Sequence, residues 1–289
     1  MHILENDVLK VVVSKHGAEL QSIYNKKNQK EYLWQGDKAY WERKSPILFP
    51  IVGKLANNTY HVKGRVYHLT RHGFARDMTF EIIEKSKHYV KFMLKANEET
   101  MFIYPYNFKL TVSYRLVDNR LTVKYKVYNN SAGLMYFSIG AIPVFNTNLS
   151  ENGIEDYYLD FEENKTLKAK VIDTEVNLVK KEEKQIIDKK DKLDLDYSLF
   201  EDDILIFEDV SKVILKNKIN DEKIRITHDF PLLGIWTSRR NPKCPFISLE
   251  PLHGIGDYVG IPQEISDKPF IQSVLPNGKF RTKYTLEID

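Results

Sequence analysis

The stretch FKLTVSYRLVDNRLTVKYKV, residues 108–127, decides the fold class. Every second residue of its first nine is apolar or aromatic, and polar or charged residues stand between them. After the turn-forming pair Asp118-Asn119, the same alternation resumes. A period of two places alternate side chains on opposite faces of a strand. The stretch therefore predicts two half-buried strands paired as an antiparallel hairpin.

Similar short runs recur along the chain, and no long segment carries the stripe of an amphipathic helix. They lie near residues 9–13, 89–94, 204–207, 223–227, 246–249 and 280–288. An aromatic content of 12% also suits pleated, partly buried strands. We expect an all-β fold of packed antiparallel sheets, a large sandwich. With 289 residues, 42% of them hydrophobic, the chain can bury one core, and a single domain over 1–289 is expected.

The composition argues against several classes of protein. A formal net charge of +3 on 289 residues is too small for the basic stripe of a nucleic-acid binder. The single cysteine, Cys244, cannot form an intramolecular disulfide, which favours a reducing, cytoplasmic setting. The first residues carry no export signal, and the apolar runs are too short to cross a membrane. We expect a soluble cytoplasmic protein that binds neither nucleic acid nor membrane; no sequence feature predicts an oligomeric state.

The stretch from Glu162 to Asp203 differs from the rest in being dense in Lys, Glu and Asp. Runs of mixed charge are usually exposed. We expect a solvated excursion between strands there, without chemistry.

No metal or nucleotide site is expected. The eight histidines are scattered, and His61, His68 and His72 lack the compact spacing of a structural zinc site. The Gly254-Ile255-Gly256 segment is too short for a dinucleotide fingerprint and opens no helix. The sequence thus indicates a protein that works without a cofactor.

Two segments have an unusual composition. The first is HGFARD, residues 72–77, preceded by the Pro/Gly-rich SPILFPIVGK at 45–54. The second is ISLEP, residues 247–251. Alternation in the second places Ser248 and Glu250 on the face opposite Ile247 and Leu249, and Pro251 is expected to end regular pairing. Glu250 is therefore predicted at the end of a strand.

Together with other segments, these two make the chain resemble the aldose 1-epimerase (galactose mutarotase) superfamily, in its LacX-type, galactose-mutarotase-related branch. The resembling segments are GAELQS at 17–22, FPIVGK at 49–54, HGFAR at 72–76, FSIGA at 137–141, LF at 199–200, LGIW at 233–236 and LEP at 249–251. The resemblance runs along nearly the whole chain. It implies a galactose-mutarotase-like β-supersandwich with an open sugar-binding cleft.

The resemblance also implies roles for single residues. Glu250 falls at the position of the catalytic base and His72 at the first active-site histidine. Lys54 falls where the family places a basic residue near the sugar hydroxyls. A carboxylate that takes the proton of the anomeric hydroxyl, with an acid for the ring oxygen, opens the sugar ring by general acid–base catalysis and lets it reclose as the other anomer. Only protons move, so this chemistry needs no cofactor.

At one position the chain departs from the resembled family. The branch usually reads Gly-Ala-His-Pro-x-Phe, and residues 140–145 read GAIPVF. Ile142 thus replaces the second histidine, the general acid, and cannot carry a proton. Either His72 takes over protonation of the ring oxygen, another residue or water does, or the protein binds sugars with little catalysis.

Four further residues admit two interpretations each. Arg76 either pairs with Asp77 or another carboxylate or contacts the substrate. Trp236 either fills the core, the favoured interpretation, or stacks on a sugar. His253 and Asp257 either belong to a surface loop, again the favoured interpretation, or edge the cleft.

Three functions stay open at this point. The first is a mutarotase that interconverts the α and β anomers of a hexose. The second is a non-catalytic carbohydrate-binding or sensing protein, which Ile142 favours. The third is a mutarotase for a hexose 6-phosphate, with Lys54, Arg71 and Arg76 supplying positive charge.

Overall fold

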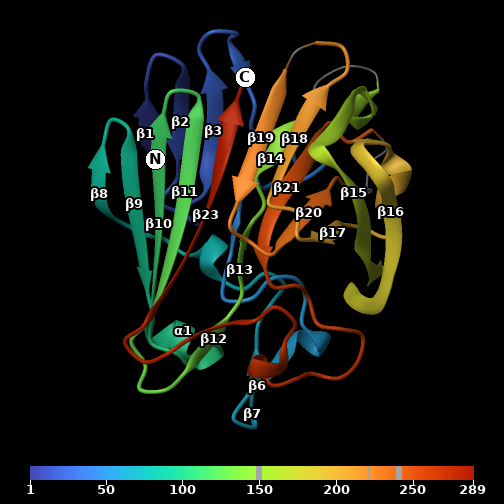
Figure 1. Cartoon of the computed structure of the whole chain (residues 1–289). Helices are drawn as coiled ribbons and strands as arrows, with labels where there is room; N and C mark the ends of the chain where they lie inside the picture. The colour runs from blue at the N-terminus through green and yellow to red at the C-terminus, as the bar shows by residue number, and fades with distance from the viewer. Residues whose placement is uncertain (148–151, 221, 239–242) are drawn as a thin grey trace.

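A computed structural model describes residues 1–147, 152–220, 222–238 and 243–289. Almost all regular structure in these residues is antiparallel strand, in one large sheet and three smaller ones (Figure 1). The one α-helix in this part of the chain is the short α1 (Glu98–Ile103). Single 3₁₀ turns occupy Ala56–Asn58, Ala75–Asp77, Gly153–Asp156, Tyr197–Phe200 and Ile265–Asp267. The predicted all-β class is confirmed.

The large sheet carries most of the strands. In spatial order it runs β5 (Ile47–Leu48), β13 (Ile139–Ala141), β21 (Phe246–His253), β20 (Leu232–Trp236), β17 (Leu205–Glu208), β15 (Tyr157–Asp173), β18 (Lys212–Asn217), β19 (Lys223–His228), β23 (Lys279–Ile288), β11 (Arg120–Asn129), β10 (Phe108–Val117), β9 (Tyr89–Lys95) and β8 (Glu81–Ser86). Off this path, β14 (Val144–Asn146) pairs with β21, and β16 (Leu178–Asp194) pairs with β15.

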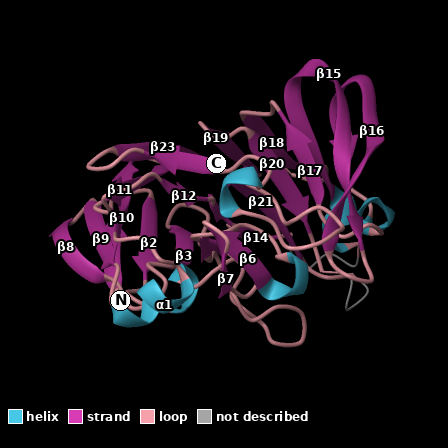
Figure 2. Ribbon diagram, turned by 90° about the horizontal axis from the view of Figure 1, so that it is seen from below, coloured by secondary structure: helices cyan, strands magenta, loops and turns pink. Residues whose placement is uncertain are grey.

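The smaller sheets complete the sandwich. One has four strands, β1 (His2–Glu5), β2 (Leu9–Val13), β3 (Leu20–Asn25) and β4 (Lys30–Glu31). The other two are the pairs β6 (Thr59–Val62) with β7 (Arg65–His68) and β12 (Met135–Phe137) with β22 (Gln272–Val274). The four-stranded sheet lies beside β9–β11 (Figure 2), and the buried Tyr114 hydroxyl of β10 donates to the Ala18 carbonyl at 2.7 Å. Apolar side chains of both layers form one core.

The predicted hairpin over 108–127 is β10–β11. Its strands pair antiparallel in continuous register, with Leu116 opposite Leu121 and Tyr114 opposite Val123. Asp118 takes a positive φ of 50° at the turn, a conformation that Asp tolerates better than most residues. The alternation of buried and exposed side chains follows the sequence pattern closely.

The charged stretch from 162 to 203, expected as a solvated excursion between strands, forms most of a long hairpin. Strands β15 and β16 have 17 residues each; β15 lies between β17 and β18 in the large sheet, and β16 pairs with β15 off that path (Figure 1). Most of the β16 side chains are exposed, as mixed charge predicts. Residues of this stretch also line the cavity described below.

Strand β21 is buried along its whole length, and Pro251 does not end its pairing. Pro251 lies opposite Leu233 of β20, and the strand continues to His253. Leu249 donates its N–H to the Pro143 carbonyl, toward β13 and β14. The nitrogen of Pro251, two residues on, points to the same side. That side is interrupted between β13 and β14, so a residue without an N–H fits there.

Candidate functional site

A cavity of about 530 Å³ opens beside the wall formed by β17, β20 and β21. The loop that contains Gly53 and the HGFAR segment close one side, and the end of the β15–β16 hairpin closes another. Its lining includes Glu250, His72, Arg76, Trp236 and Ile142, which the sequence analysis singled out. A cavity of this size, in which charged and polar side chains stand beside apolar and aromatic ones, is typical of a small-molecule site.

Three strands present their side chains to this cavity in register. Ile206 of β17 lies opposite Gly234 of β20, which lies opposite Glu250 of β21. A Cβ on Gly234 would stand 3.1 Å from the Glu250 Cβ and 2.8 Å from the Ile204 Cδ1. The glycine therefore provides the space in which the Glu250 side chain lies.

Glu250 is a buried carboxyl group, 3% exposed, in the middle of a strand and not at its end. Ser248 donates its hydroxyl to Oε1 at 2.7 Å. Burial raises the pKa of Glu250 to about 7, against the opposing effects of the Ser248 hydrogen bond and the Arg71 charge, while Asp203 raises it further. A carboxyl group that titrates near neutral pH is suited to take up and release a proton.

His72 faces the same cavity as a neutral imidazole. Its backbone N–H donates to the Gly53 carbonyl at 2.9 Å, and its Nδ1 accepts the Gly53 N–H at 3.2 Å. Because Nδ1 accepts, the ring proton sits on Nε2. Burial holds the pKa of His72 well below its usual value, and the charges of Arg71, Arg76 and Arg43 lower it further. His72 is therefore a hydrogen-bond donor at neutral pH and not a cationic acid.

Asp203 is a cavity residue that sequence reasoning missed. Its Oδ1 accepts the indole N–H of Trp236 at 2.8 Å, and its Oδ2 lies 3.5 Å from Nη2 of Arg71. It holds a positive φ of 74° two residues before β17, a strand that lines the cavity. The sequence around Asp203 did not indicate a site residue, because Asp203 is one of many acidic residues in this charged stretch.

The apolar part of the lining contains Ile142. This side chain is 5% exposed and packs in a cluster with Val52, Leu252 and Ile255. Its N–H donates to the Pro46 carbonyl at 3.1 Å. In this position the cavity has an apolar wall and no proton donor.

Aromatic side chains form a further part of the lining. Trp41 and Trp236 meet edge to face with ring centroids 5.5 Å apart, and Tyr40 lines the cavity beside them. Trp236 thus packs against Trp41 and Phe246, as the favoured interpretation expected, and also borders the cavity.

The two predicted basic residues differ in position. Arg76 lines the cavity, lies 3.7 Å from Asp77 through Nε, and donates from Nη2 to the Arg71 carbonyl at 2.8 Å. The Lys54 ammonium instead donates to the Val176 carbonyl at 2.8 Å, in the turn between β15 and β16. Lys54 is absent from the lining formed by the described residues. This hydrogen bond connects the β15–β16 turn to the loop that contains Lys54.

The favoured surface-loop interpretation of His253 and Asp257 was wrong, because both are buried. His253 ends β21, packs 4.6 Å from the Phe230 ring centroid, and shares a hydrogen bond of 3.2 Å with the Thr282 hydroxyl. Asp257 forms a buried ion pair with Lys268 and accepts the Ala56 N–H at 2.9 Å. Each has partners inside the protein that the sequence could not reveal.

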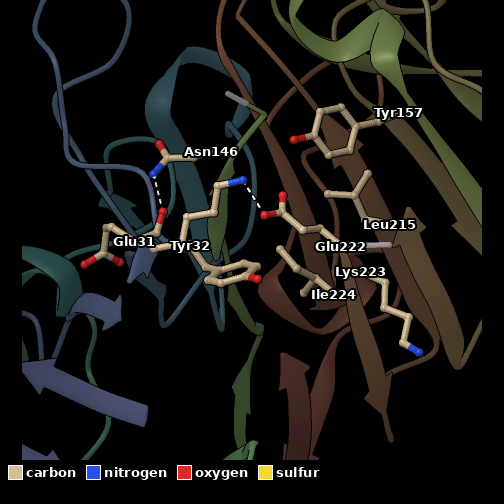
Figure 3. Close-up of a pocket in the computed structure, with 9 residues that line it drawn as sticks. Glu31, Tyr32, Asn146, Tyr157, Leu215, Glu222, Lys223 and Ile224 are labelled. Carbon is tan, nitrogen blue, oxygen red and sulfur yellow. Dashed lines mark hydrogen bonds and ion pairs between the residues drawn. The ribbon is translucent and has the colours of Figure 1, made fainter. Parts of the chain in front are cut away.

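A second hollow lies between β4 and the strands β15, β18 and β19 (Figure 3). It is bridged by an ion pair between Lys30 and Glu222, and its volume of about 20 Å³ holds little more than one water molecule. It is too small for a sugar.

In the described part of the chain as a whole, no group of three or more His, Cys, Asp or Glu is placed to hold a metal ion. Among the same residues, none of the helices has the length and apolarity that a bilayer crossing requires.

Comparison with known proteins gives a consistent result. The family model described as aldose 1-epimerase matches residues 1–261. Chromosomal LacX of Lactococcus lactis is 33% identical over 296 residues, covering 99% of this chain and 98% of that protein. Plasmid-encoded LacX of the same organism has the same identity and coverage.

Two solved structures match along the whole of this chain. A galactose mutarotase-like protein from Lactobacillus casei is 32% identical, with a TM-score of 0.95 and full coverage of both chains. A galactose mutarotase related enzyme from Lactobacillus acidophilus is also 32% identical, with a TM-score of 0.92 over 100% of this chain and 97% of that one. The expected galactose-mutarotase-like fold is confirmed by these two structures.

Proposed function

The chain belongs to the aldose 1-epimerase family, and we propose that it interconverts the α and β anomers of a free hexose in the cavity beside β21. The observation that carries this proposal is the buried Glu250, whose pKa of about 7 lets it accept and return a proton at neutral pH. Family membership supports a carbohydrate-binding protein of the isomerase class.

In the proposed reaction, Glu250 acts as the base. Its carboxylate takes the proton from the anomeric hydroxyl, the bond between C1 and the ring oxygen breaks, and C1 becomes an aldehyde carbon. The ring oxygen gains a proton in the same step. Rotation about C1–C2 and the reverse sequence give the other anomer and return the proton from Glu250. All bonds and protons balance, so no cofactor takes part.

We assign His72 to hydrogen bonding at the ring oxygen. A neutral imidazole donates its Nε2–H and stabilises negative charge that develops there, but it is a poor source of a proton. Since Ile142 cannot donate a proton either, we propose that a water molecule in the open cavity protonates the ring oxygen and, as the hydroxide it leaves, takes the proton back from that oxygen when the ring recloses. Loss of a general acid typically costs about 10²–10⁴-fold, so the reaction is slower than with an acid at position 142.

Other lining residues are proposed to hold the sugar. Trp236 and Trp41 offer aromatic surface to its apolar face, and Asp203, kept in place by Trp236, can accept hydrogen bonds from hydroxyl groups. Arg76 borders the sugar, and we propose that Lys54 acts indirectly by fixing the turn at Val176. We also propose that the chain is a single domain, and that the free thiol of the buried Cys244 reflects a reducing, cytoplasmic location.

A hexose 6-phosphate is the second candidate substrate. Arg71 and Arg76 both line the cavity, the Arg71 side chain is 47% exposed, and Arg76 Nε is buried without a hydrogen-bond acceptor among the described residues. Two guanidinium groups can bind a phosphate dianion. A cavity that also contains Asp203 and Glu250 favours the neutral sugar as the first choice.

Anomer exchange by NMR on glucose, galactose and their 6-phosphates tests the proposal. We expect the protein to accelerate exchange of at least one free hexose above the buffer rate. Acceleration of the 6-phosphates alone would favour the second candidate. Binding without acceleration would identify a non-catalytic sugar-binding protein, and neither binding nor exchange at millimolar sugar would contradict all three.

A further inference from the structure

We propose that Ser248 is the positioning residue of Glu250: its hydroxyl holds Oε1 of the carboxyl group and leaves Oε2 to meet the anomeric hydroxyl of the sugar. The inference rests on the proposed function for the sugar. The contact between the two side chains does not depend on it.

The first observation is the placement of the two side chains. Ser248 precedes Glu250 by two residues on β21, so both project from the same face of the strand. Its hydroxyl oxygen lies 2.7 Å from Oε1. Ser248 is fully buried, and Glu250 is 3% exposed. Water therefore competes little for this hydrogen bond, which gives the carboxyl group a fixed orientation.

The second observation is a further acceptor for the same hydroxyl. The Ser248 oxygen lies 3.2 Å from the Trp236 carbonyl of the neighbouring strand β20. A serine hydroxyl has one hydrogen and two lone pairs. When Glu250 is ionised, the hydroxyl donates to Oε1. When the resting protein carries a proton on Oε1, that proton is donated to the serine oxygen and the serine hydrogen turns to the Trp236 carbonyl.

This geometry keeps both protonation states of Glu250 hydrogen-bonded inside the protein. An unpaired polar group in such a place is costly, so each state gains from this partner, and the hydrogen bond to the charged carboxylate is the stronger of the two. During the reaction the proton from the sugar goes to Oε2 and returns from it. Ser248 continues to donate to Oε1 and neither gains nor loses a proton, so it acts only through Glu250.

The consequence for Glu250 is electrostatic. The hydrogen bond from Ser248 favours the ionised carboxylate and opposes the effect of burial on its pKa. Without the hydroxyl, Glu250 is ionised in a smaller fraction of the molecules at neutral pH, and only the ionised form can act as a base. The carboxyl group is also free to rotate about its last torsion angle, which lowers the rate of the ionised form as well.

Ser248→Ala, with Ser248→Thr as the rescue, tests the proposal. We expect Ser248→Ala to raise the pKa of the Glu250 carboxyl group by about one to two pH units, the size that loss of one hydrogen bond to a charged group corresponds to. The threonine variant keeps the hydroxyl and should restore the original value. The pKa is read by pH titration of ¹³C-labelled glutamate side chains in NMR, with Glu250→Gln to assign the resonance.

The activity readout is the pH profile of kcat/KM for anomer exchange. Its acidic limb should move to higher pH by the same amount in Ser248→Ala and stay in place in Ser248→Thr. Ser138→Ala is the control, because it removes another buried hydroxyl, one without a hydrogen-bond partner in the part of the chain that the structure describes. This control should change neither the pKa nor the profile.

An unchanged Glu250 pKa in a folded Ser248→Ala protein would overturn the inference. If that variant does not fold, Ser248→Cys replaces it, and its weaker donor should give a smaller upward shift; no shift would again overturn the inference. If the natural protein exchanges no anomers, the proposed function fails while the NMR titration still decides the role of Ser248.

Discussion

Glu250 is an ionisable side chain that the fold buries at a free-energy cost. Its pKa is raised from the usual 4.5 to about 7 in the folded protein. The folded state therefore binds more protons than the unfolded state between these values, and stability falls as the pH rises through this window. Above pH 7 the whole cost is present, and below pH 4.5 it is absent.

We predict that Glu250→Gln abolishes anomer exchange and raises stability at pH 8.5. The amide keeps the size of the side chain but cannot act as a base. Removing the buried charge should increase the free energy of unfolding by up to about 3 kcal/mol at pH 8.5, and by less at pH 5. Chemical denaturation at both pH values checks this, with the exposed Glu182→Gln as the matched control. Full exchange activity in the variant would place the base elsewhere.

Ile142 gives the second prediction for a single residue. Ile142→His should raise anomer exchange by up to about 10²–10⁴-fold if a proton donor for the ring oxygen is the missing element. The gain will be smaller if the imidazole is misplaced, since about 1 Å can cost about 10²-fold. Ile142→Gln is the control, because it adds a polar group that cannot titrate. A folded, sugar-binding histidine variant without any gain would show that the acid is not limiting.

At the scale of single elements, the wall of β17, β20 and β21 depends on Gly234. We predict that Gly234→Ala lowers kcat/KM for anomer exchange by about tenfold or more, because the new methyl group meets the Glu250 Cβ at 3.1 Å and displaces the carboxyl group. The thermal midpoint should change little, since the closest neighbour is the end of the flexible Ile204 side chain. Gly133→Ala adds the same group where nothing lies within 4 Å and should behave as the natural protein does. Equal activities would contradict this role of Gly234.

The strands themselves show which features a sequence can predict. The hairpin over 108–127 was predictable because alternation and a two-residue turn are local properties. The prediction that Pro251 ends the pairing of its strand was wrong. The gap between β13 and β14 that accommodates this proline lies about a hundred residues away in sequence, so local sequence could not reveal it. Asp203 and the partner of Lys54 were missed for the same reason: their contacts, with Trp236 and Val176, exist only once distant segments meet.

At the scale of the whole molecule, two buried histidines lower the free energy of unfolding at acidic pH. His228 and His253 are neutral in the core, and burial lowers the pKa of each to about 4. Below pH 6.5 the unfolded chain takes up protons that the folded protein does not, so stability is lost as the pH falls from 6.5 to 4. Glu250 acts in the opposite direction between pH 7 and 4.5, but it is one group against two.

We predict a net loss of stability over this range, up to about 3 kcal/mol for each histidine before the effect of Glu250 is subtracted. His228→Asn keeps an acceptor for the Phe230 N–H, and His253→Gln keeps a partner for the Thr282 hydroxyl. Each variant should flatten the pH dependence of the unfolding free energy between pH 6.5 and 4. His88→Asn, at an exposed position, is the control. An unchanged slope in both core variants would show that other groups cause the acid sensitivity.

The place of β23 in the large sheet has a consequence for the order of events on the ribosome. This strand follows every other strand of the sheet in sequence, yet it lies between β19 and β11 and joins the two halves of the sheet. During synthesis the halves can each begin to form, but they cannot close on one another until residues 279–288 have been translated. A nascent chain without residues 279–288 therefore exposes the facing edges of β19 and β11, which β23 pairs in the folded protein. Until β23 pairs with them, these exposed strand edges promote aggregation.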